Sequence, residues 1–149
     1  MEIIEQLTAS KEQTLMYFEL DDAELDKTYA SGKWSIRHIL HHLADAETVL
    51  YDRIRRVISE PRPVVWSFDQ DAWARELDYA HLPLYLSRQI YASVRDGIIY
   101  QAQTHYLSKG HLEFVHNEAG LGKLKDLFER VASHNTRHLN QIERALSAS

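Results

Sequence analysis

Residues 131–146 read VASHNTRHLNQIERAL, and this stretch carries the pattern from which the fold can be worked out. Apolar residues and histidines recur at steps of three and four, which predicts an amphipathic helix with one buried face. His138 falls near the centre of that face and His134 on its flank, one turn away. Because a buried face normally carries leucine or valine, the two histidines are either hydrogen-bonded core residues or ligands of a cation.

The composition is that of one folded domain. The chain has 149 residues, of which 44% are hydrophobic and 26% charged, so we expect a single domain spanning residues 1–149. The net charge of -5 argues against a nucleic-acid partner. The absence of cysteine excludes disulfides, thiolate zinc sites and a cysteine nucleophile. With no signal sequence and no membrane-length apolar run, a cytoplasmic protein without a membrane partner is expected.

Four segments have the periodicity of long helices, and they predict an all-α four-helix bundle. We expect these helices at about 2–20, 35–59, 82–107 and 121–146. Ser35 is the predicted N-cap of the second helix, and the sequence EPRP at 60–63 should end it. The second connector, VVWSFDQDAWAREL at 64–77, should hold a short extra helix. The stretch SKGHLEFVHNEAGLG at 108–122 is interpreted as a connector with a brief extended piece.

The second helix adds one more inward histidine. His42 borders its buried face beside the small Ala46, whereas His38 and His41 lie on the opposite side and are expected at the surface. His42, His134 and His138 would then offer three neutral nitrogens to one volume between two helices. Three protein ligands are typical of catalytic metal sites, because closed structural sites use four. Three hydrogen-bonded core histidines remain the alternative at this point.

Glu47 and Asn135 also project inward by periodicity. They are candidate partners for the imidazole N–H groups, or else polar groups that other neighbours satisfy. Imidazole accepts zinc, nickel, copper or iron, and we expect a divalent ion, with zinc or nickel favoured. No side chain is assigned as the catalytic group, which would instead be a water molecule or a thiol bound to the ion.

The remaining aromatic and basic residues are not assigned to the site. The aromatic side chains of the second connector should cover the open side of the bundle, since they lack the interleaved basic residues of a strand-binding surface; they are Trp66, Phe68 and Trp73. Three arginines lie on the helices that carry the predicted ligands but stay outside the predicted site: Arg37, Arg53 and Arg137. Of the other histidines, His81, His105 and His111 receive no ligand role, and His116 could approach the site from its connector.

Three stretches resemble the DinB-like superfamily, especially its YfiT-like branch. They are GKWSIRHILHHLADAE at 32–47, FVHNEAGLGKL at 114–124 and HNTRHLNQI at 134–142, and the connector RPVVWSFDQDAWARE at 62–76 is also similar. The resemblance covers nearly the whole chain. It implies a four-helix bundle of up-down-down-up topology with a metal held by three histidines, which map onto His42, His134 and His138. Gln141 and Asn117 depart from the pattern, since many relatives have histidine and proline there, and this weakens any inference about the substrate.

Members of this superfamily resemble metal-dependent hydrolases, or thiol transferases that use low-molecular-weight thiols such as bacillithiol, mycothiol or glutathione. For this chain the resemblance implies a metal-dependent enzyme of the thiol-S-transferase or hydrolase type, with a small-molecule substrate that includes such thiols, and a homodimer. The lack of cysteine is consistent with a sulfur nucleophile that comes from a cosubstrate. The competing interpretation is a non-catalytic, stress-related helical scaffold or sensor with a structural metal or none.

Overall fold

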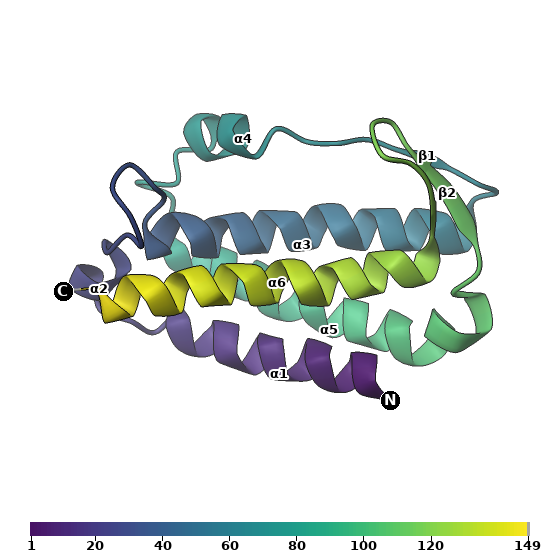
Figure 1. Ribbon diagram of the computed structural model, residues 1–149, viewed down its shortest axis with the longest axis horizontal. Helices are drawn as coiled ribbons and strands as arrows, with labels where there is room; N and C mark the ends of the chain where they lie inside the picture. Colours follow the sequence, from purple (N-terminus) through teal and green to yellow (C-terminus); the bar gives the residue numbers. More distant parts are fainter. Residues whose placement is uncertain (149) are drawn as a thin grey trace.

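Four long helices make up the bundle in the computed structural model, which describes residues 1–148. They are α1 (Glu2–Tyr17), α3 (Ile36–Ser59), α5 (Leu84–Lys109) and α6 (Leu124–Ser147). In Figure 1, α1 and α6 run in one direction and α3 and α5 in the other, which is the predicted up-down-down-up order. Because α3 and α5 are parallel, the chain must cross the length of the bundle between them.

The helix ends follow local capping chemistry. The Ser35 hydroxyl accepts a hydrogen bond from the His38 backbone N–H at the start of α3, as predicted. Helix α1 ends three residues earlier than expected, and the chain then forms a single turn, α2 (Asp22–Leu25), capped by Asp21. Helix α6 begins later than expected, at Leu124, because the residues before it form a strand.

The two longer connectors meet in a small three-stranded sheet. β1 (Val64–Val65) pairs in parallel with β2 (Glu113–His116), which pairs antiparallel with β3 (Gly120–Lys123). Gly120 has a φ of 83°, the left-handed conformation that glycine adopts readily, at the turn between β2 and β3. The extra helix predicted in the second connector is α4 (Gln70–Glu76), which lies over the bundle (Figure 1).

A polar layer divides the hydrophobic core in two. One apolar cluster holds Leu7, Ile98 and Phe128, and the other holds Leu40 and Tyr91. The sequence positions between the two clusters carry buried polar side chains, and they are Ser10, Thr14, Glu47, Arg95 and Asn135. The second cluster packs under the end of the bundle that carries the predicted ligands. Among the described residues, no helix combines the length and apolar character needed to cross a membrane.

Candidate metal centre

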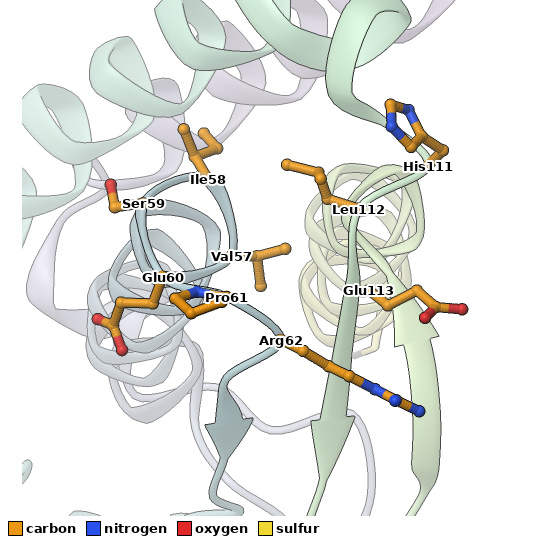
Figure 2. A pocket seen from close by; sticks show the side chains of 9 residues that line it. All are labelled: Val57, Ile58, Ser59, Glu60, Pro61, Arg62, His111, Leu112 and Glu113. Carbon is orange, nitrogen blue, oxygen red and sulfur yellow. The ribbon is translucent and has the colours of Figure 1, made fainter.

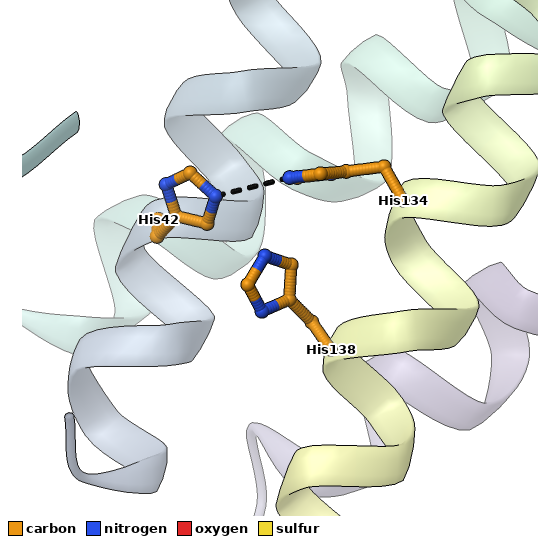
Figure 3. A group of neighbouring side chains, drawn as sticks. All are labelled: His42, His134 and His138. Atoms are coloured by element: carbon orange, nitrogen blue, oxygen red, sulfur yellow. Dashed lines mark hydrogen bonds between the residues drawn. The ribbon is translucent and has the colours of Figure 1, made fainter. Parts of the chain in front are cut away.

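The three predicted ligands lie together across the seam between α3 and α6 (Figure 3). His42 projects from α3, and His134 and His138 project from consecutive turns of α6. The Nε2 atoms of His42 and His134 are 3.1 Å apart. One nitrogen from each of the three rings lies within 4.8 Å of the others. Because α3 and α6 are antiparallel, residues far apart in sequence are brought to one level of the bundle.

Aromatic side chains hold the His42 ring in place. The ring is 1% exposed, and it packs against Trp34 at 5.1 Å and Phe68 at 6.4 Å between ring centroids. Phe68 in turn packs on Trp73 at 4.8 Å. The second connector therefore covers this side of the bundle, as the sequence predicted, although Trp66 is mainly exposed.

Gln141 sets the orientation of His138. The Gln141 side-chain oxygen lies 2.8 Å from His138 Nδ1. Since that oxygen can only accept, Nδ1 carries the proton and Nε2 keeps its lone pair. His138 Nε2 is buried and has no hydrogen-bond partner among residues 1–148. A buried, unpaired acceptor at the centre of the histidine cluster is what a metal ligand provides.

Burial keeps the three imidazoles neutral. Removal from water, with smaller contributions from the charges of His138 and Arg137, lowers the pKa of His42 to about 3. Burial also lowers the pKa of His134 to about 2, with smaller contributions from His138 and His42. The pKa of His138 is lowered by burial, too. Three neutral nitrogen donors at neutral pH fit a divalent ion such as zinc or nickel.

Glu47 and Asn135 are buried as predicted, but their hydrogen bonds go to other partners. Both Glu47 carboxylate oxygens accept from Arg95, at 2.9 and 2.7 Å. The Asn135 side-chain oxygen accepts from Tyr91 and Arg95, and its amide donates to Thr14. Of the two roles considered for these residues, the structure shows the second, polar groups that other neighbours satisfy. The partner that reaches an imidazole is Gln141, which the sequence marked only as a departure from its relatives.

The prediction that His41 lies at the surface is wrong. Its side chain is fully buried, with Nδ1 at 2.6 Å from the Ser87 hydroxyl of α5 and the ring packed on Tyr79. Burial lowers its pKa to about 4. The chain after α4 and the start of α5 cover this face of α3, which the periodicity of one helix cannot reveal. His38 is only partly buried and contacts Ser35 through Nδ1.

His116 does not join the cluster. Its Nδ1 accepts hydrogen bonds from the backbone N–H groups of Glu118 and Ala119, which closes the turn between β2 and β3. Among the residues that the structure describes, His42, His134 and His138 form the one grouping whose ligand atoms lie close enough together to hold a metal ion.

A surface groove reaches one member of the cluster, His138. It has a volume of about 290 Å³ and is lined by His138 and Gln141 of α6, by Lys33 and Trp34 before α3, and by Asp71 of α4. A larger hollow of about 580 Å³ lies at the opposite end of α3, between its last turn and the start of β2 (Figure 2). That hollow contains none of the predicted site residues.

Comparison with known proteins gives one consistent family. The family model described as the DinB superfamily matches residues 6–142. A protein of Oceanobacillus iheyensis named "Putative metal-dependent hydrolase" is 33% identical over 130 residues, which are 86% of this chain and 73% of that protein. A protein of the same name from Halalkalibacterium halodurans is 28% identical over 127 residues, covering 85% of this chain and 74% of the relative.

The fold also has a close structural neighbour. YfiT from Bacillus subtilis superposes with a TM-score of 0.88, at 21% identity, over 97% of this chain and 83% of that one. It is described as "a probable metal-dependent hydrolase with an unusual four-helix bundle topology". At this level of identity the match bears on the fold, which it confirms.

Proposed function

The chain belongs to the DinB superfamily, and from this membership and the histidine cluster we propose that it is a metal-dependent hydrolase. In this proposal His42, His134 and His138 hold one divalent ion. The observation that carries it is the convergence of three neutral imidazoles, of which His42 and His138 are buried and His134 is half-buried, and the His138 Nε2 has no hydrogen-bond partner among residues 1–148. The names of the bacillary relatives support the same reaction class.

The chemistry of the donor set explains why such a site would be reactive. An ion held by three neutral ligands keeps its full positive charge and open coordination positions, so it supplies Lewis acidity that activates water and polarises a substrate oxygen. No carboxylate belongs to the cluster. The protein's own contribution is to fix the rings: Gln141 orients His138, and Trp34 and Phe68 pack on His42.

The groove beside His138 gives a small substrate a path to the ion. Its walls combine the Trp34 ring with the polar side chains of Lys33, Asp71 and Gln141. A volume of about 290 Å³ suits a small molecule and is near the lower limit of common ligand pockets. We therefore assign substrate entry to this groove and not to the larger hollow at the other end of α3.

Thiol transfer is the second candidate reaction. It would use the same ion to lower the pKa of a thiol, as metal coordination deprotonates thiols in general. Since the chain has no cysteine, the sulfur would come from a low-molecular-weight cosubstrate. Activity towards ester, amide and lactone substrates, assayed with and without added thiols, separates the two reactions.

Metal analysis tests the proposal directly. We expect one zinc or nickel ion per chain after purification without chelators, and less than a tenth of that in His138→Ala. His111→Ala is the matched control, because His111 is exposed and far from the cluster. Circular dichroism should show the same helix content in all three proteins. Metal-free wild-type protein that takes up no ion on addition would overturn the proposal and favour a non-catalytic scaffold.

A further inference from the structure

Arg53 is a buried cation that lacks an acidic partner. Its side chain lies on α3, only 9% exposed, and its Nη2 donates to the Trp66 carbonyl at 2.5 Å. Within residues 1–148 no carboxylate lies within ion-pair distance of it; the adjacent Asp52 pairs with Arg56 at 2.8 Å. Since burying an unpaired charge is costly, a site of this kind is typical of a position that an anion occupies.

Arg130 brings a second guanidinium to the same cavity. Arg53 and Arg130 border a hollow of about 250 Å³ between α3, α6 and the β2–β3 turn. Burial lowers the pKa of Arg53, and the nearby charge of Arg130 lowers it further. Arg130 is exposed, and it is in none of the ion pairs found in the described part of the chain. Both guanidinium groups line one cavity, and their mutual repulsion favours the binding of an anion there.

The other polar groups leave the cavity with a net positive charge, because its two arginines outnumber its one carboxylate, that of Asp126. Asp126 also lines it, but its carboxylate accepts from the Lys123 backbone N–H at 3.0 Å and caps α6. His116 is a third lining residue. Because its Nδ1 accepts two backbone N–H groups, the neutral ring carries its proton on Nε2 and can donate a hydrogen bond.

The cavity lies along the same seam as the histidine cluster. Arg130 precedes His134 by one turn of α6, about 6 Å along the helix axis, and its charge contributes to the lowered pKa of His134. Arg53 lies three turns after His42 on the antiparallel α3, so both arginines are on the sheet side of the cluster. The cavity and the groove beside His138 share no lining residue, so a substrate that contacts both would have to extend along the seam between α3 and α6.

We propose that Arg53 and Arg130 form an oxyanion site, which binds a carboxylate or phosphate group of the substrate while its reacting bond lies at the histidine cluster. Guanidinium groups suit both oxyanions, because their paired N–H donors match the geometry of two oxygens. The substrate class is then a small anionic molecule whose charged group is about one helical turn or more from the bond that reacts. The link to catalysis rests on the proposed function, whereas anion binding itself requires no metal.

The test uses metal-free protein and two probes, inorganic phosphate and succinate, titrated calorimetrically at low ionic strength. We expect both to bind the wild type, with the tighter one identifying the preferred oxyanion. Arg130→Gln should weaken binding about tenfold, as expected for the loss of one charge-assisted contact. Arg130 is exposed, so this variant should fold. Arg53→Lys keeps the charge but loses the paired donors, and it should give a smaller loss.

Arg137→Gln is the matched control, with the same charge change on an exposed position two turns away on α6. It should bind both probes as the wild type does. Equal losses of anion affinity in Arg130→Gln and Arg137→Gln would show that the effect comes from the overall charge of the protein, and would overturn the proposal. Wild-type protein that binds neither probe at about 20 mM would overturn it as well. Metal content, measured on the same variants, keeps this outcome separate from the histidine proposal. A variant can lose phosphate binding and keep its ion, or the reverse.

Discussion

Gln141 is the residue that decides which nitrogen of His138 is free. Its side-chain oxygen accepts the Nδ1 proton, and removing it would let the ring rotate or change tautomer. We predict that Gln141→Leu lowers zinc affinity about tenfold while zinc still binds. Competition with a chromogenic chelator measures the affinity. Asn140→Leu is the control, because Asn140 is the exposed neighbour on α6. Equal zinc affinities of Gln141→Leu and wild type would contradict the role of Gln141.

His41 makes folding stability depend on pH without taking part in the cluster. Its native pKa is about 4, whereas a histidine in the unfolded chain titrates near 6.5. Between these values the unfolded state binds more protons, so the free energy of unfolding should fall as the pH falls from 6.5 to 4 and stay level above 6.5. The buried histidines of the cluster act in the same direction in metal-free protein.

The contribution of His41 can be isolated by substitution. In metal-free protein, the free energy of unfolding should fall as the pH is lowered from 6 to 5. We predict that the slope of this fall is smaller in His41→Gln than in wild type by about 1 kcal/mol per pH unit. Urea unfolding at fixed pH values measures the slope. If the free energy of unfolding has the same slope against pH in wild type and in His41→Gln, then His41 is protonated in the native state over this pH range.

Residue by residue, the sequence predicted the histidine cluster better than its surroundings. His42, His134 and His138 could be found because each lies on or beside the apolar stripe of its own helix. The roles of His41 and Gln141 could not be found in this way. His41 has its hydrogen-bond partner on another helix, and the contact of Gln141 depends on how its side chain lies along its own helix. Arg53 is the same case: its burial depends on a connector that returns over α3.

At the scale of the elements, Arg95 ties all four long helices together. From α5 it binds Glu47 of α3, the Leu7 carbonyl and Ser10 hydroxyl of α1, and Asn135 of α6, with distances between 2.6 and 2.9 Å. Each of these Arg95 hydrogen bonds crosses between helices, whereas the Ser10 and Thr14 hydroxyls also donate to carbonyls within α1. A fully paired buried network of this kind fixes the register of the helices, and thereby the relative height of His42 and His134.

Breaking one side of this network should be costly. We predict that Arg95→Met lowers the free energy of unfolding by about 3–5 kcal/mol, because Glu47 is then left buried without a partner. The double variant Glu47→Leu/Arg95→Met should be less destabilised than Arg95→Met alone, since no charge remains in the layer. Urea unfolding of the three proteins tests this. A cost below about 1 kcal/mol for Arg95→Met would mean that water reaches the layer.

Helices and sheet differed in how far they could be predicted. Within each helix the apolar residues recur with the helical period, so the type and the approximate span of the four long helices could be predicted, as could α4. The pairing of β1 with β2 joins Val64 to Val115, and a two-residue strand carries no pattern of its own. The expected extended piece in the third connector is confirmed as β2 and β3, but the sheet depends on long-range pairing.

On the scale of the whole molecule, the homodimer stays a prediction. Four large apolar side chains of α5 are exposed and lie on one side of the helix, because they are separated by four, ten and seven residues, each close to a whole number of turns; they are Leu86, Ile90, Tyr100 and Leu107. We propose this stripe as the contact between two copies. Sedimentation equilibrium should give twice the mass of 17.4 kDa, and Tyr100→Glu/Leu107→Glu should give the mass of one chain. A wild-type protein that sediments as one chain at 100 μM or so would contradict the dimer.

The histidine cluster joins two antiparallel helices that no covalent link holds at this level, so ion binding should stabilise the entire fold. An ion that binds only the native state adds about 2.7 kcal/mol at one hundred times its Kd, which for a chain of this size raises the unfolding midpoint by about 5–10 °C. We predict this shift for zinc added to metal-free wild type, its reversal by a chelator, and no shift in His42→Ala. Magnesium is the control ion, because it prefers oxygen ligands and should leave the midpoint unchanged. If zinc shifts His42→Ala as much as wild type, the ion binds elsewhere, and α3 and α6 are held together by the Arg95 layer and the apolar core alone.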